Sequence, residues 1–386
     1  LVIEVLRRGA AGRSEPDPPV VEGSGSSVSV RLCGAEPGQP LHVLIAEDLV
    51  DQAYVAAHTN GFEALAEIAR SYPPAVVAEI CGVEATDIVK AARWFGGSAA
   101  SLSMYCQGLN QSAHGTHNNA GIIHLHLATG QIGKPGAGPF SLTGQPNAMG
   151  GREVGGLSNL LSAHRDLGNP AHRAEMARFW GVPFVPSKPG KSAVDLFKSL
   201  KTGEIKAVWI ACTNPAQSLP NQAAVREALQ TAEYVVLQEA YGNTDTADYA
   251  DLLLPASGWG EKHGTVTNSE RCITRVLPAV QAPGEARHDW EIVVDFARRL
   301  GQKLDHAGAA KLFPYTDTEA IFNEHRESTR GRDLDITGLS YALLESEGPQ
   351  QWPYPEGASS GKVRLYEDGR FPTPDGRARL DRKSVV

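Results

Sequence analysis

The chain has 386 residues, of which 41% are hydrophobic and 21% are charged, and its formal net charge at pH 7 is −8. This length suffices for two or more packed domains. The acidic balance argues against a general nucleic-acid or membrane-surface binder, since both are usually basic. No stretch approaches the roughly 20 apolar residues of a membrane-spanning helix. We therefore expect a soluble globular protein that binds neither nucleic acid nor membrane.

The first 40 residues differ from the rest of the chain. They are rich in Gly, Ser, Pro and charged residues and show little periodicity, so we expect residues 1–40 to be irregular or disordered. Regular structure is expected to follow them. Apolar residues at helical spacing predict a helix over 62–72, ended by Pro73 and Pro74, and a second helix over 86–97.

The pattern of the following segments predicts a strand over 99–105 and, because it is almost wholly apolar, a buried helix over 117–130. Between residues 200 and 300, short apolar runs alternate with amphipathic segments. The predicted strands are 206–211, 233–238 and 251–255, and the predicted helices are 221–232 and 289–301, the latter stopped by Gly301. This alternation indicates an α/β fold in which parallel sheets carry helices on both faces.

Polar loops follow the predicted strands. They are 107–111, 212–218, 238–250 and 256–271, and they are rich in Asn, Gln, Thr, Asp and Gly. In parallel sheets ligands bind beyond the carboxyl ends of the strands, so these loops are candidates for contacts to a polar, ring-bearing ligand. The alternative is that these residues only form turns. No Walker A motif and no clear G-x-G-x-x-G motif is present, which argues against a conventional ATP or NAD enzyme.

Cysteine usage points to a reduced, cytoplasmic protein. The five cysteines are scattered and include no C-x-x-C pair, which favours free thiols over a disulfide framework and gives no sign of a complete zinc or iron–sulfur site. Cys106 and Cys212 follow predicted strands and are expected to be small core residues. His124 and His126 lie two apart and would face different directions on a helix, so we do not expect a metal cluster there.

A long segment then carries a family resemblance. QGLNQSAHGTHNNAGIIHLHLATGQIGKPGAGPFSLTGQPNAMGGREVGG, residues 107–156, resembles the central part of the molybdopterin-guanine-dinucleotide oxidoreductases, the dimethyl sulfoxide reductase family. Within that family it is most similar to the assimilatory nitrate reductase branch. The later segments ACTNPAQSLP, DYADLLLPASGWGEKHGTVTNSER and PGEARHDW follow in the family's order, and the similarity covers about residues 40–380.

The resemblance implies a bis-molybdopterin guanine dinucleotide cofactor with one molybdenum, and reduction of nitrate to nitrite. It implies that 41–140 is part of a first α/β domain, that 141–305 is a dinucleotide-binding α/β domain, and that 306–386 is a helical and irregular segment leading to a C-terminal cap. The residues matching cofactor contacts of the family are Gln107, Gln111, Gln145, Asn214, Gln238, Glu239, Lys262 and Asp289. Glu261, beside Lys262, is expected to be an orienting partner.

Arg152 lies in the Gly-rich stretch 138–156 and matches an arginine near the substrate funnel of the family. The glycines would let the backbone wrap closely around a bulky cofactor. A guanidinium is permanently charged and presents a fork of donors to a planar anion such as nitrate, so Arg152 is the candidate catalytic residue. The alternative is a structural ion pair with a buried carboxylate.

We expect the chain to be the central fragment of a larger enzyme and to be inactive by itself. Family members carry a [4Fe–4S] cluster and a molybdenum ligand upstream, and neither motif is found here. The electron donor would be a ferredoxin, a flavoprotein or an NADH-linked reductase subunit. Two alternatives remain open: a formate dehydrogenase of the same family, and a non-catalytic relative such as an iron–sulfur subunit of a respiratory complex.

Overall fold

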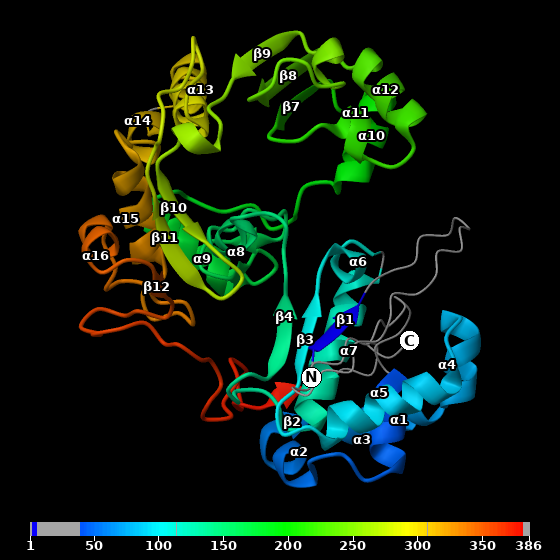
Figure 1. The fold of residues 1–386 in the computed structure, drawn as a ribbon. Coiled ribbons are helices and arrows are strands. Elements are labelled where there is room, and N and C mark those ends of the chain that lie inside the picture. Colours follow the sequence, from blue (N-terminus) through cyan, green and yellow to red (C-terminus); the bar gives the residue numbers. More distant parts are fainter. Residues whose placement is uncertain (1, 6–38, 113, 307, 381–386) are drawn as a thin grey trace. The chain divides into compact units, whose positions relative to one another are not determined.

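The computed structural model describes residues 2–5, 39–112, 114–306 and 308–380. The chain divides into two compact units, one formed by 1–145 together with 362–386 and the other by 146–361. Figure 1 shows the elements of each unit. Among the described residues, none of the helices combines the length and the apolarity needed to cross a membrane.

The first unit packs a layer of helices around a small parallel sheet of order β1-β3-β4. The strands β3 and β4 pair in parallel from Leu102↔Gly138 to Tyr105↔Ser141. The elements of this unit are β1 (Val2–Val5), α1 (Gln39–Ala46), α2 (Gln52–His58), β2 (Thr59–Asn60), α3 (Phe62–Arg70), α4 (Pro74–Cys81), α5 (Ala85–Gly97), β3 (Leu102–Tyr105), α6 (Gln107–Asn110), α7 (Gly115–Ala128), β4 (Gly138–Ser141) and β13 (Ala378–Arg379).

Most predicted elements of this unit are confirmed. Helix α3 buries Leu65 and Ala69, and α5 buries Phe95. Helix α7 is buried over most of its length, as its apolar sequence predicts. The expectation of an irregular stretch 1–40 is wrong at β1, where a run of β-branched residues pairs in parallel with β3; residues 6–38 lie outside the described residues.

The second unit contains a parallel sheet β7-β8-β9 and an antiparallel sheet β10-β11-β12. Its elements are α8 (Ala148–Glu153), β5 (Leu160–Leu161), β6 (Arg165–Asp166), α9 (Pro170–Trp180), α10 (Ala193–Lys201), β7 (Ala207–Ala211), α11 (Pro215–Ser218), α12 (Gln222–Thr231), β8 (Tyr234–Glu239), η1 (Ala247–Tyr249), β9 (Leu252–Pro255), η2 (Trp259–Glu261), β10 (Gly264–Thr267), β11 (Cys272–Val276), α13 (Asp289–Lys303), α14 (Ala309–Leu312), α15 (Thr318–Ser328), α16 (Tyr341–Ser346) and β12 (Gln350–Gln351).

Helices cover both faces of the parallel sheet. Strand β7 pairs in parallel with β8, and β8 with β9. Ile210 and Val208 pack into the apolar cluster that contains Val225 and Leu229 of α12. Because side chains alternate along a strand, Trp209 points to the opposite face, where its ring lies 4.8 Å from that of Phe296 on α13. The predicted α/β architecture is therefore confirmed.

Two details of this unit differ from the sequence prediction. Helix α13 runs through Gly301 to Lys303, because this glycine is buried within the helix and does not form its C-cap. The predicted loop 256–271 includes β10, whose β-branched residues pair antiparallel with β11 up to Thr267↔Ile273.

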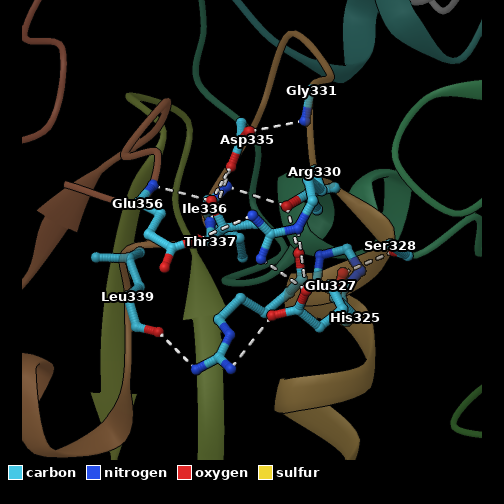
Figure 2. A network of polar contacts seen from close by, with 12 residues as sticks. His325, Glu327, Ser328, Arg330, Gly331, Asp335, Ile336, Thr337, Leu339 and Glu356 are labelled. Carbon is cyan, nitrogen blue, oxygen red and sulfur yellow. Dashed lines mark hydrogen bonds and ion pairs between the residues drawn. The ribbon is translucent and has the colours of Figure 1, made fainter. Parts of the chain in front are cut away.

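The end of α15 is tied to the loop that follows it by a network of polar contacts (Figure 2). Asp335 accepts from the backbone N–H of Gly331 at 2.7 Å and from the Thr337 hydroxyl at 2.6 Å. On the exposed side, Arg330 pairs with Glu327 at 2.9 Å and with Glu356 at 3.0 Å. These bonds add to the burial of Leu334, Ile336 and Leu339 in the same loop.

Candidate functional site

A groove of about 480 Å³ lies at the carboxyl ends of β7, β8 and β9 in the second unit. This is the edge at which the polar loops were predicted to bind a ligand. Side chains that can ionise or form hydrogen bonds line it. They come from the segments after β7, β8 and η2 and from the start of α13, and include Cys212, Glu239, Lys262, His263 and Asp289.

Asp289 is the first residue of α13, and its carboxylate has three partners. Oδ2 lies 2.5 Å from the Lys262 ammonium. Oδ1 accepts from the Gln238 amide at 2.7 Å and from the Cys212 thiol at 3.6 Å. Burial opposes ionisation of Asp289, but the bonds from Lys262 and Gln238 outweigh it, so its pKa is lowered. The start of a helix also favours a negative charge, so this carboxylate is ionised at neutral pH.

Glu239 ends β8, and its side chain lines the same groove. Its Oε1 accepts from the backbone N–H groups of Ala240 at 2.7 Å and Tyr241 at 3.4 Å. The groove therefore presents two carboxylates and one ammonium. This set can accept hydrogen bonds from hydroxyl or ring N–H groups and donate to a carbonyl or phosphate oxygen.

Gln238 does not line this groove. The residue is only 1% exposed. Its buried Oε1 has no hydrogen-bond partner among the described residues. Asn214, which follows β7, is also used internally: its Oδ1 accepts from the Thr246 hydroxyl at 2.6 Å and its Nδ2 donates to Gln217 at 3.1 Å. The structure thus brings Lys262, Asp289 and Glu239 together and places Asn214 outside their groove.

Cys212 is not a core residue, contrary to the sequence prediction. Its backbone adopts φ 58°, and the residue is exposed at the groove. The left-handed turn after β7 directs the side chain away from the sheet's apolar interior. The groove walls partly shield the thiol from water, and this desolvation and the nearby Asp289 raise the Cys212 pKa, so the thiol is protonated at neutral pH and can donate. Cys106 is only partly buried.

Gln107, Gln111 and Gln145 belong to the first unit. Gln107 begins α6 directly after β3, and Gln111 caps the same helix. Gln145 follows β4, and its Oε1 accepts from the Thr143 hydroxyl at 3.0 Å. All three are exposed. Because β3 and β4 are parallel neighbours, these glutamines follow the same edge of that sheet.

Arg152 lies on the short helix α8, within the Gly-rich stretch 138–156. The residue is exposed, and its Nε donates to the backbone oxygen of Ala148, one turn earlier, at 3.4 Å. Within the described parts of the chain, no carboxylate forms an ion pair with it. The structural ion pair considered as the alternative is therefore not formed with these residues.

The neighbouring Glu153 is a buried residue that was not among the site residues predicted from the sequence. It is 2% exposed, and its oxygens accept from the Thr267 hydroxyl at 2.8 Å and the Trp352 indole at 2.5 Å. Burial raises its pKa, opposed by these hydrogen bonds. The only signal in the sequence was a lone acid in a Gly-rich stretch.

Glu261 does not contact Lys262 as an orienting partner. Its Oε2 accepts from the backbone N–H of Gly258 at 2.7 Å and caps the turn η2. The partner that orients Lys262 is Asp289. Sequence adjacency was misleading here because side chains of consecutive residues point in different directions.

The sequence and structure comparisons define the class of protein. The molybdopterin oxidoreductase family model matches residues 39–299, and the chain belongs to this family. The chain is 44% identical to the nitrate reductase of Synechocystis sp., over 86% of this chain and 46% of that protein. It is 37% identical to the assimilatory nitrate reductase catalytic subunit of Bacillus subtilis, over 88% of this chain and 46% of that protein.

The chain thus spans about half the length of these relatives. Among solved structures, acetylene hydratase from Pelobacter acetylenicus is similar with a TM-score of 0.62 and 19% identity, over 90% of this chain and 47% of that one. This likeness confirms the fold.

Proposed function

We propose that this chain forms part of the catalytic subunit of a molybdenum-dependent nitrate reductase. The observation that carries the proposal is its 44% identity to a nitrate reductase over most of its length. A second relative at 37% identity is an assimilatory catalytic subunit, which favours nitrate assimilation in the cytoplasm. The molybdenum–pterin cofactor follows from the family; its guanine dinucleotide form is part of the proposal.

The second-unit groove would hold one end of such a dinucleotide. The Watson–Crick edge of guanine places the acceptor O6 next to the donors N1–H and N2–H₂. The adjacent ammonium of Lys262 and carboxylate of Asp289, 2.5 Å apart, offer a donor beside an acceptor for O6 and N1–H. Glu239, at the groove wall, would accept from ribose hydroxyls. When bound, the cofactor supplies the oxygen-transfer and electron chemistry, and the protein supplies binding and orientation.

The other family-matched residues extend the same proposal. Gln107, Gln111 and Gln145 would contact the cofactor from the first unit, where their exposed amides follow one sheet edge. Asn214 would stabilise the loop after β7 through Thr246. Arg152, exposed and paired with no carboxylate of the described chain, would attract the nitrate anion through parallel N–H donors.

The proposal includes a [4Fe–4S] cluster and an electron donor such as a ferredoxin, a flavoprotein or an NADH-linked reductase subunit. Reduction of nitrate to nitrite consumes two electrons, which such a chain of carriers would deliver one at a time.

The test is an activity assay on the full-length gene product isolated with its cofactor. Molybdenum and released guanine nucleotide are quantified, and nitrate reduction and formate oxidation are measured with artificial electron carriers. Nitrate reduction with molybdenum and guanine nucleotide present supports the proposal. Formate oxidation without nitrate reduction would assign the formate dehydrogenase activity instead, and absence of molybdenum would indicate a non-catalytic relative.

A further inference from the structure

Asp289 is held by donors that come from three separate segments. Gln238 is the penultimate residue of β8, Cys212 follows β7, and Lys262 follows η2. Two of them, the Gln238 amide at 2.7 Å and the Cys212 thiol at 3.6 Å, meet on the same oxygen, Oδ1. The Lys262 ammonium pairs with the other oxygen, Oδ2, at 2.5 Å.

This distribution divides the carboxylate into an internal and an outward oxygen. Each carboxylate oxygen has two lone pairs. The two donors on Oδ1 use both of its lone pairs, whereas Oδ2 keeps one beside the Lys262 ammonium. Lys262 and Asp289 both line the groove, with side chains that are each 31% exposed.

Gln238 reaches Asp289 from inside the sheet. Its residue is 1% exposed and is absent from the groove lining, so it touches Asp289 without facing a ligand in the groove. Its Oε1 has no hydrogen-bond partner within the described chain. Its Nε2 donates to Asp289 Oδ1.

Cys212 reaches the same oxygen through an uncommon backbone conformation. Its φ of 58° lies in the left-handed region, which non-glycine residues rarely adopt. The backbone N–H of Cys212 donates to the backbone oxygen of Gln238 at 3.1 Å. This bond links the left-handed turn at Cys212 to Gln238, the other residue that donates to Oδ1. A glycine would adopt this turn without strain but would place no donor on Asp289.

We propose that Cys212 and Gln238 are positioning residues for nucleotide recognition, which occupy Oδ1 of Asp289 and so hold Oδ2 and the Lys262 ammonium toward the base. This inference rests on the proposed function of the groove and assigns two residues that act through Asp289. A carboxylate fixed in advance loses less rotational freedom on binding. A carboxylate free to rotate would turn either oxygen toward the base, and Oδ2 would no longer stay beside the Lys262 ammonium.

The test measures binding of guanosine monophosphate to this chain by calorimetry, together with the melting temperature of each variant. Gln238→Leu and Cys212→Ala remove one donor each. We expect the Kd of Gln238→Leu to rise about tenfold, the scale of one hydrogen bond to a charged group, and that of Cys212→Ala to rise by a smaller factor, because a thiol is a weak donor.

Two further variants separate positioning from folding. Cys212→Ser keeps a donor and should restore most of the affinity lost in Cys212→Ala. Cys212→Gly keeps the turn without strain, so it should lose affinity without a lower melting temperature. Cys272→Ser, on β11 outside the groove lining, is the matched control and should bind like the unsubstituted chain.

The outcomes distinguish this inference from the function on which it rests. If the unsubstituted chain binds the nucleotide and all donor-lacking variants bind it equally well, Cys212 and Gln238 do not position Asp289 and the inference is wrong. If the unsubstituted chain itself does not bind, the groove is not a nucleotide site, and the proposed function of the groove falls together with the inference.

Discussion

The indole N–H of Trp352 donates a 2.5 Å hydrogen bond to the carboxylate of Glu153, 199 residues earlier in the chain. Thr267 of β10 donates to the other oxygen of the same carboxylate at 2.8 Å. A single buried acid thus links α8, the antiparallel sheet and the segment after β12. It also anchors the short helix that carries Arg152.

Removing the indole donor of Trp352 should lower the free energy of unfolding of the second unit. In Trp352→Phe the carboxylate of Glu153, 2% exposed, would lose one of its two side-chain donors, and a buried polar group left without its partner costs about 1–3 kcal/mol. Thr267→Val, which removes the second donor, should cost a similar amount. Urea unfolding measures the change. Equal stability of both variants and the parent protein would show that Glu153 is not an anchor.

Replacing Arg152 should affect nitrate use without loss of the metal. Arg152→Lys keeps the charge but loses the fork of parallel donors, so in the full-length enzyme we expect a loss of about 1.5–3 kcal/mol in kcat/KM for nitrate. Arg152→Ala should lose at least as much. Steady-state nitrate reduction and molybdenum quantification check this. Unchanged kinetics would exclude a substrate role, and loss of molybdenum would assign Arg152 to cofactor retention.

Acidification should unfold the protein partly through two buried histidines. Burial lowers the pKa of His126 to about 3 and that of His325 to about 4. The unfolded state has a histidine pKa near 6.5 and therefore binds protons first as the pH falls. The stability that each neutral histidine contributes is complete above about pH 6.5 and is lost progressively toward pH 3–4, at up to about 1.4 kcal/mol per pH unit.

His126→Gln tests this dependence. The substitution removes the titrating ring that lies 2.8 Å from Ser103 Oγ. Between pH 7 and pH 5 its free energy of unfolding should fall by about 2 kcal/mol less than that of the parent protein. His306→Gln, at an exposed residue, is the control and should keep the parent slope. Parallel pH profiles for all three proteins would contradict the prediction.

Two arginines of the second unit should differ sharply in their contribution to stability. The Arg165 side chain is 3% exposed, pairs with Glu175 at 2.6 Å, and donates to the backbone oxygens of Ser162 and Ser328 at 2.9 and 2.8 Å. Arg165→Met should cost about 3 kcal/mol, because it leaves buried acceptors unpaired. Arg330 is 53% exposed, so Arg330→Met should cost less than about 1 kcal/mol.

Chemical denaturation of both variants checks the ranking. A loss for Arg330→Met equal to that for Arg165→Met would show that the exposed network of Figure 2 contributes more than its burial indicates.

The local pattern of the sequence determined the elements of the fold and the edge where the candidate site lies. Apolar runs set β7, β8 and β9, and helical spacing set α5 and α12, because periodicity records which face of each element is buried. Since parallel strands end at one edge, the loops 238–250 and 256–271 could be assigned to the same edge of the sheet from sequence order.

Only the tertiary structure decided what each side chain does. It turned Gln238 inward onto Asp289, exposed Cys212 at a left-handed turn, and joined Glu153 to Trp352 across most of the chain. These relationships depend on backbone direction at single residues and on contacts between distant segments. Neither leaves a periodic signal in the sequence, because a hydrogen bond between two residues constrains their positions in space and not their spacing along the chain.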